Sequence, residues 1–288
     1  MKSFLGLLFF FICSHIGNSQ SLTSERVAKI KRATVRITIA NDNSMGTGFF
    51  VDENGYILTC WHVISPSIII NNNQIVGVKQ IYAELNDGSI IKVAIPMIFF
   101  GDPNLNKNAI GNDFCLLVPM DKILRRTDYL KVGEFDEVKE GDEVYTCGYP
   151  IGIRQQFISK GIVSTKYPET SIVTYNGLRN AIPRSVALLD LTLNKGNSGG
   201  AIVKIGKTID DDEVVGIADF IVTPMGGIAD SLINSFDSSE KYFSVTMGGV
   251  DPVKTFSLMT KLISSLSIGV SGCISLDYYL RSLGHKKE

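Results

Sequence analysis

The sequence predicts an all-β protein built from barrels or sandwiches. Runs rich in β-branched and aromatic residues recur along the chain, and turn-forming pairs such as Asn54-Gly55 and Asp87-Gly88 separate them. These runs do not alternate with helices, which argues against a parallel sheet made of βαβ units. The expected strands cover residues 34–40, 46–60, 75–85, 89–100, 142–150, 157–167, 171–175, 185–191, 201–205 and 213–220.

Composition limits the classes of function. A chain of 288 residues with 44% hydrophobic residues can bury a sizeable core, in one large or two modest domains. Its formal net charge of -1 leaves no excess of basic residues for a phosphate backbone. We therefore expect no nucleic-acid partner.

Residues 1–19 are predicted to be a signal peptide. Lys2 precedes an apolar run from Phe4 to Cys13, which is too short to span a bilayer as a helix. Small residues at Gly17 and Ser19 suit a cleavage site just before Gln20. We expect an exported protein, periplasmic or secreted, without a stable membrane anchor; an uncleaved N-terminal anchor helix is the alternative.

Two helices are expected outside the strands. Residues 21–34 form the N-terminal one, and residues 251–266 form a C-terminal helical segment with Asp251 as its cap and Pro252 in its first turn. The polar stretch 125–143 separates two sets of strands. The expected division is residues 20–130 for the first unit and 131–288 for the second.

The cysteines indicate neither a metal site nor a dense disulfide framework. Beyond the signal peptide they are widely spaced, without a CxxC pair, and each lies in an apolar run. We expect buried thiols at Cys60, Cys115, Cys147 and Cys273.

The segment NKGNSGGAIV, residues 194–203, places Ser198 among three glycines. Glycines weaken helices and strands alike, so this backbone either approaches a ligand closely or forms an ordinary turn. A nucleophilic serine needs a base, and His62 is the one histidine that lies neither in the signal peptide (His15) nor near the C-terminus (His285).

An acid is needed to orient that histidine. Asp113 precedes an apolar run, where burying a carboxylate is costly unless a protonatable partner lies beside it. Asp102 is the rival, although Pro103 after it is more typical of a turn.

Five segments together resemble a trypsin-like serine protease of the bacterial Deg/Htr type. They are MGTGFFVDENGYILTCWHVI (45–64), GNDFCLLV (111–118), GYPIG (148–152), SKGIVS (159–164) and LDLTLNKGNSGGAIV (189–203), and the resemblance covers roughly residues 25 to 283. It implies two antiparallel β-barrels of the chymotrypsin type, with the site in the cleft between them. Mapped onto this sequence, the catalytic residues are His62, Asp113 and Ser198, and Asp190 and Asn194 also match the pattern.

The chemistry that follows is hydrolysis of peptide bonds in polypeptide substrates through an acyl-enzyme. The backbone amides of Gly196 and Ser198 would form the oxyanion hole. No metal and no cofactor are expected.

The chain departs from that family in several places. Cys60 and Trp61 replace the usual small residues before the histidine, no IVGG-like N-terminus is visible, and residues 225–267 form a longer connection than usual. We expect no PDZ module.

Two alternatives stay open. One is a catalytically silent peptide-binding protein on the same fold. The other is an esterase of the α/β-hydrolase type, because GNSGG also satisfies G-x-S-x-G; that elbow requires a helix directly after the serine, whereas residues 199–217 read as two strands.

In trypsin-like folds, the segment before the serine and the last strands of the second barrel line the pocket for the residue before the cut. The corresponding residues here are Thr192, Leu193, Val270, Ser271 and Gly272, none of them charged. We expect a preference for small or medium apolar residues.

Overall fold

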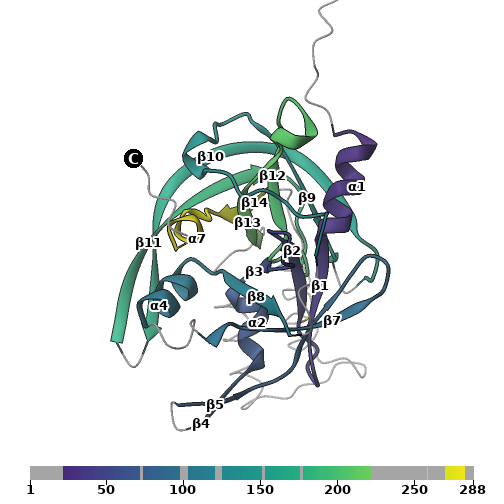
Figure 1. Ribbon diagram of the computed structural model, residues 1–288. Helices are drawn as coiled ribbons and strands as arrows, with labels where there is room; N and C mark the ends of the chain where they lie inside the picture. The colour runs from purple at the N-terminus through teal and green to yellow at the C-terminus, as the bar shows by residue number, and fades with distance from the viewer. Residues whose placement is uncertain are drawn as a thin grey trace, which may run out of the picture.

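Two closed barrels of six antiparallel strands form the body of the protein, as seen in the computed structural model (Figure 1). The prediction of an all-β protein with two chymotrypsin-type barrels is confirmed. The structure describes residues 22–71, 74–97, 103–120, 125–150, 153–175, 178–221, 258 and 270–282.

The first barrel has the strand order β1-β2-β3-β8-β7-β6. Gly55 and Gly88 lie in its turns with φ of 80° and 84°, a left-handed conformation that glycine adopts without strain, as the Asn-Gly and Asp-Gly pairs predict. The strands are β1 (Thr34–Ile39), β2 (Met45–Phe50), β3 (Ile57–Thr59), β6 (Ile81–Glu84), β7 (Ile90–Ala94) and β8 (Cys115–Pro119). A separate two-stranded sheet, β4 (Ile68–Asn71) and β5 (Gln74–Val78), follows β3.

The second barrel has the order β10-β11-β14-β13-β12-β9. Its strands are β9 (Glu143–Gly148), β10 (Phe157–Tyr175), β11 (Leu178–Asp190), β12 (Ala201–Lys204), β13 (Glu213–Ile221) and β14 (Val270–Ile274). The helices in the described ranges are α1 (Ser24–Ala33), α2 (Trp61–Ile64), α4 (Pro103–Gly111) and α7 (Asp277–Ser282), with 3-10 turns η1 (Ser65–Ser67), η2 (Phe135–Glu137) and η4 (Ile209–Asp211).

Strands β10 and β11 form a hairpin much longer than the barrel needs (Figure 1). The sequence predicted two separate strands, 157–167 and 171–175, on either side of Pro168, but one continuous strand is found. Beyond Ile162, β10 no longer pairs with β9, and β11 is its one partner among the strands that the structure describes. A proline is tolerated there because its missing N–H faces an unpaired edge.

A single buried apolar cluster spans both barrels. It contains Phe49 and Leu58 from the first barrel and Val203 and Ile217 from the second, all at most 1% exposed. The barrels therefore pack against each other through a continuous core, which fixes the residues between them.

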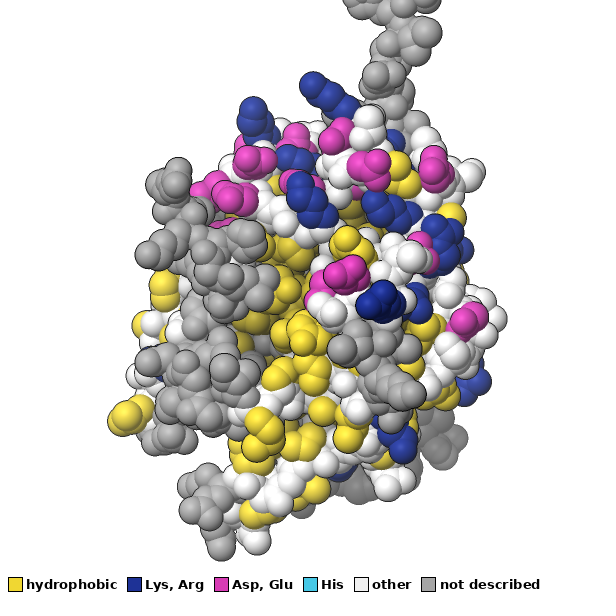
Figure 2. Space-filling view, viewed as in Figure 1, with side chains coloured by type: hydrophobic (Ala, Val, Ile, Leu, Met, Phe, Trp, Pro, Cys, Tyr) yellow, Lys and Arg dark blue, Asp and Glu magenta, His cyan; other side chains and the backbone are white. Residues whose placement is uncertain are grey.

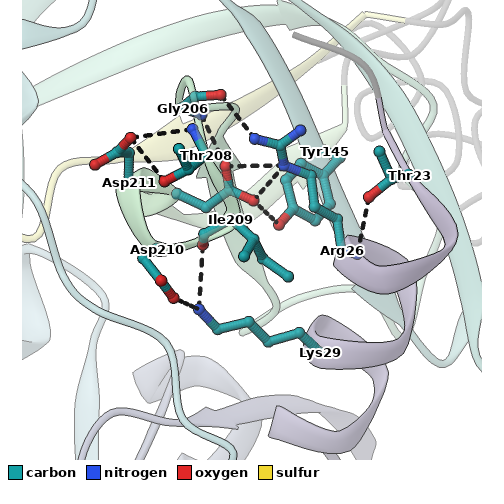
Figure 3. Close-up of polar contacts among 10 residues, drawn as sticks. Thr23, Arg26, Lys29, Tyr145, Gly206, Thr208, Ile209, Asp210 and Asp211 are labelled. Atoms are coloured by element: carbon teal, nitrogen blue, oxygen red, sulfur yellow. Dashed lines mark hydrogen bonds and ion pairs between the residues drawn. The ribbon is translucent and has the colours of Figure 1, made fainter.

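Helix α1 is tied to the second barrel by a buried ion pair (Figure 3). Arg26 Nε lies 2.8 Å from Oδ2 of Asp212, and the two side chains are only 6% and 4% exposed. The Tyr145 hydroxyl donates to the same carboxylate at 2.8 Å, and Arg26 Nη2 donates to the Gly206 carbonyl at 2.7 Å. Every oxygen of this buried charge thus has a donor, as a paired interior charge requires.

The surface around α1 mixes both signs of charge: Figure 2 shows Lys, Arg, Asp and Glu side chains interspersed over the upper part of this face.

All four cysteines expected as thiols, Cys60, Cys115, Cys147 and Cys273, are free and buried, which confirms that prediction. Within the described part of the chain, no helix is long and apolar enough to cross a membrane.

Some expectations fall outside the described residues. These are the signal peptide (1–19), the helix at 251–266 apart from residue 258, most of the 225–267 segment, Asp102 and His285. The division of the chain at residue 130 stays a prediction. The alternative of an α/β-hydrolase-type esterase is wrong. Its nucleophile elbow requires a helix directly after the serine, whereas Ser198 is followed by strand β12.

Candidate active site

Ser198 lies in the turn between β11 and β12, and the first barrel holds this turn from the other side. The amide of Thr47 in β2 donates to the Ser198 carbonyl at 2.8 Å. The Thr47 hydroxyl donates to the Gly196 carbonyl at 2.6 Å and accepts from the amide of Tyr149 at 3.2 Å. One buried threonine of the GTGF strand therefore fixes both sides of the serine.

The glycine after the serine allows a very close approach of three backbones. Gly199 has φ of 87°, and a Cβ placed on it would lie 2.1 Å from the Thr47 carbonyl oxygen and 3.0 Å from the Cys60 amide. A side chain is excluded both by space and by conformation. Because Cys60 stands two residues before His62, this contact places the serine turn beside the start of α2.

Hydrogen bonding along the turn leaves alternate amides open. The amides of Asn197, Gly199 and Gly200 donate to the carbonyls of Asn194, Ala218 and Asn197, at 2.8–3.0 Å. Among the residues that the structure describes, the amides of Gly196 and Ser198 form no hydrogen bond. Gly196 adopts φ of 100°, which only glycine reaches without strain. Two unengaged amides at this spacing can bind a developing oxyanion.

Asp113 is positioned by the end of helix α4, an element that the sequence did not predict. The amide of Asp113 donates to Ile110 and that of Phe114 donates to Ala109, at 3.1 and 3.0 Å. This is the Schellman pattern, whose C′ residue is left-handed and usually glycine. Asp113 takes that place with φ of 48°. An aspartate there is mildly strained, as is common at functional positions.

His62 and Asp113 are joined by two short polar contacts. The Nδ1 atom of His62 lies 2.6 Å from Oδ2 of Asp113, and the backbone amide of His62 donates to Oδ1 at 2.9 Å. The Asp113 carbonyl also accepts the Trp61 amide at 3.2 Å. Asp113 therefore satisfies the first amides of α2 and holds the imidazole, leaving Nε2 as the ring nitrogen that can accept a proton.

The contact between His62 and Asp113 shifts the pKa of both side chains. Burial would lower the pKa of His62, but the hydrogen bond and charge of Asp113 outweigh it, so that pKa is raised above 6.5. Burial would raise the pKa of Asp113, but hydrogen bonds from His62 and Asp219 outweigh it, so that pKa lies below 3.8.

Asp219, near the end of β13, is a residue that the sequence analysis missed. Its Oδ1 lies 3.7 Å from Nδ1 of His62, and one of its carboxylate oxygens lies within 4.8 Å of one of Asp113. The signal was present in the sequence, because Asp219 interrupts the apolar run VVGIADFIV (214–222), much as Asp113 directly precedes one. A carboxylate in such a place is costly to bury without a partner.

Four potential metal ligands cluster at this site: the side-chain ligand atoms of Cys60, His62, Asp113 and Asp219 lie within 4.8 Å of one another. A thiol must lose its proton to ligate. Burial raises the pKa of Cys60 well above its usual value, and its Sγ donates to the Ala218 carbonyl at 3.3 Å. The donor set therefore fits a metal poorly, and the expectation of no metal stays a prediction.

The residues predicted to line the substrate pocket lie at several depths. Thr192 is exposed and Val270 is half-buried, whereas Leu193 is packed in the core of the second barrel at 2% exposure. Ser271 is buried and its hydroxyl donates to the Leu191 carbonyl at 2.6 Å. Gly272 is buried as well. The assignment of these residues to the pocket stays a prediction.

Comparison with known proteins agrees with this arrangement. The family model described as trypsin-like peptidase domain matches residues 46–217. A probable periplasmic serine endoprotease, DegP-like, from Halomonas elongata is 28% identical over 189 residues, covering 64% of this chain and 31% of that protein. The magnetosome formation protease MamE of Magnetospirillum gryphiswaldense is 30% identical over 193 residues, covering 67% and 21%. The chain thus spans about a third or less of these relatives' length.

Solved structures show the same fold. The HtrA-type protease AlgW with a tripeptide superimposes with a TM-score of 0.53 at 19% identity, covering 90% of this chain and 61% of that one. A variant of the same protease, AlgWS227A, gives a TM-score of 0.52 at 18% identity, with the same coverage.

Proposed function

The chain belongs to the trypsin-like peptidase domain family, and on that basis we propose that it is a serine endopeptidase that acts on polypeptides through an acyl-enzyme. Ser198 attacks the scissile carbonyl, His62 takes the hydroxyl proton and later gives it to the leaving amine, and Asp113 holds the imidazole. The amides of Gly196 and Ser198 bind the oxyanion.

The observation that carries this proposal is the pair of hydrogen bonds that His62 donates to the Asp113 carboxylate. An exposed surface aspartate gains little from a histidine, whereas the Asp113 carboxylate accepts hydrogen bonds from the ring and the amide of His62 at 2.6 and 2.9 Å, and its side chain is only 13% exposed. The Ser198 hydroxyl forms no hydrogen bond to any residue of the described ranges. Catalytic hydrogen bonds between a serine and a histidine are often long or poorly aligned until substrate binds.

A fluorophosphonate probe tests the proposal, because it labels only an activated serine. We expect the wild-type chain to be labelled at Ser198, and Ser198→Ala and His62→Ala to remain unlabelled. The wild-type chain should also cleave a denatured polypeptide, and Ser198→Ala should lose that activity by roughly a million-fold. An unlabelled wild-type chain would instead support the silent peptide-binding protein.

The proposed function includes export of the protein from the cytoplasm. The relatives named above include a probable periplasmic protease, and residues 1–19 carry the pattern of a signal peptide. We infer that the protein works in the periplasm or outside the cell. Sequencing the N-terminus of the protein purified from its host tests this, and a chain that still begins at Met1 would contradict it.

A further inference from the structure

A second carboxyl group lies beside the His62–Asp113 pair. The Oδ1 atom of Asp219 is 3.7 Å from Nδ1 of His62, and a carboxylate oxygen of Asp219 lies within 4.8 Å of one of Asp113. Each aspartate side chain is 13% exposed. Two carboxyl groups this close together and this well shielded from solvent do not both ionise readily, so one of them keeps its proton.

The surroundings decide which aspartate keeps that proton. Asp113 accepts from the ring and the amide of His62, and both bonds favour its ionised form. Asp219 is faced by Asp113 and His62, by the buried thiols of Cys60 and Cys273, and by Arg184. Burial, followed by the hydrogen bond and charge of Asp113, raises the pKa of Asp219 to about 8. The proton therefore belongs to Asp219.

Arg184 comes from the long β10–β11 hairpin and does not cancel this effect. Its Nη1 is 3.9 Å from Oδ2 of Asp219, beyond hydrogen-bond distance. Glu169 in the facing strand binds Arg184 far more closely, with Nε and Nη2 each 2.6 Å from Oε2. The guanidinium is thus paired with Glu169, and its charge lowers the pKa of Asp219 less than burial and Asp113 raise it.

We propose that Asp219, in its protonated form, is a positioning residue that donates a hydrogen bond to Asp113 and so holds the Asp113 carboxylate against His62. This inference rests on the proposed function. When Asp219 loses its proton to solvent, Asp113 loses a donor and gains a repelling neighbour. The added negative charge also favours the imidazolium form of His62, which cannot accept the serine proton. Turnover therefore falls in the alkaline range.

Two substitutions separate the hydrogen bond from the charge. Asparagine keeps an N–H donor for Asp113 and cannot ionise, whereas alanine removes the donor. We expect Asp219→Asn to keep kcat within about threefold at pH 7 and to lose the alkaline fall. Asp219→Ala should lose about 10- to 100-fold in kcat with KM unchanged, the range for a bond to a charged group. Asp128→Asn, which removes a carboxylate paired with Arg32 elsewhere, is the matched control.

The measurement is kcat and KM for a peptide substrate from pH 6 to 10, together with the rate of fluorophosphonate labelling. A proton NMR signal from Nδ1–H of His62 should shift near pH 8 in the wild type and not in Asp219→Asn, and this readout does not require Asp219→Ala to fold. Equal loss of kcat in both variants, wild-type kcat in Asp219→Ala, or the same alkaline limb in Asp219→Asn overturns the inference. Failure of the proposed function looks different, since the wild type itself would then be neither labelled nor active.

Discussion

Asp113 accepts two hydrogen bonds from one residue, the ring Nδ1–H of His62 at 2.6 Å and its backbone amide at 2.9 Å. The first fixes the tautomer of the imidazole, and the second fixes where α2 begins. The orientation of the imidazole and the local fold thus depend on the same carboxylate. Removing its charge should disturb chemistry more than structure, because an amide can still accept the backbone bond.

Asp113→Asn is therefore expected to lower kcat by roughly 10⁴, since the amide can hold the imidazole in the wrong tautomer. The measurement is peptide hydrolysis at saturating substrate. Asp102→Asn, the rival acid from the sequence, is the control and should stay close to wild type. Equal and mild effects in the two variants would show that the orienting acid is another residue.

The acid limb of kcat/KM should lie above pH 6.5. The pKa of His62 is raised because Asp113 stabilises the imidazolium, so the protonated, inactive form persists to higher pH than in a free histidine. Activity then rises with pH through that raised pKa. A pH profile of kcat/KM with a non-ionising peptide measures the limb, and a midpoint below 6.5 contradicts the geometry.

Thr47 should matter for turnover without touching substrate. Its hydroxyl donates to the half-buried Gly196 carbonyl and accepts from the buried Tyr149 amide, so Thr47→Val leaves both groups without this partner, at a cost of about 1–3 kcal/mol for the buried amide and less for the carbonyl. We expect a lower melting temperature and a clear fall in kcat. Thr47→Ser, which keeps the hydroxyl, should recover most of both.

Breaking the buried ion pair of Arg26 and Asp212 from one side should strongly destabilise the protein. Asp212→Ala leaves a guanidinium buried without its partner, at a cost of about 3–5 kcal/mol in the free energy of unfolding. Lys29 and Asp210 form a matched surface pair at 3.9 Å, with Asp210 91% exposed. Asp210→Ala should change the urea midpoint very little. Similar urea midpoints for the two variants would contradict a stabilising role of the buried Arg26–Asp212 ion pair.

The residues that sequence reasoning found are those whose chemistry is visible locally. His62 emerged by elimination, Ser198 from its glycines, and Asp113 from a carboxylate before an apolar strand. Helix α4 was missed because Asn104, Asn106 and Asn108 have weak helix propensity. Asp219 was missed because its partners are distant in sequence: the barrel topology brings β13 beside α2, and no local pattern encodes that contact.

The last prediction concerns the residue before the cut. Thr192 is exposed and Leu193 packs into the core, so alternation along this segment turns only the threonine outward. The Ser271 hydroxyl already donates to Leu191, which leaves no charged group and few free donors on these predicted walls. Aliphatic residues should be enriched when cleavage sites in denatured protein are profiled, with each methylene worth about 1–3 kcal/mol, and charged residues should be rejected for want of a partner.

Thr192→Asp sharpens this test, because an exposed site accepts the new carboxylate without burial. If Thr192 lines the pocket, the variant should gain cleavage after Lys and Arg, while Asp128→Asn keeps the wild-type profile. A wild-type preference for Arg, Lys or Glu, together with an unchanged Thr192→Asp profile, would mean that the pocket is built elsewhere, with the 225–267 segment the next candidate.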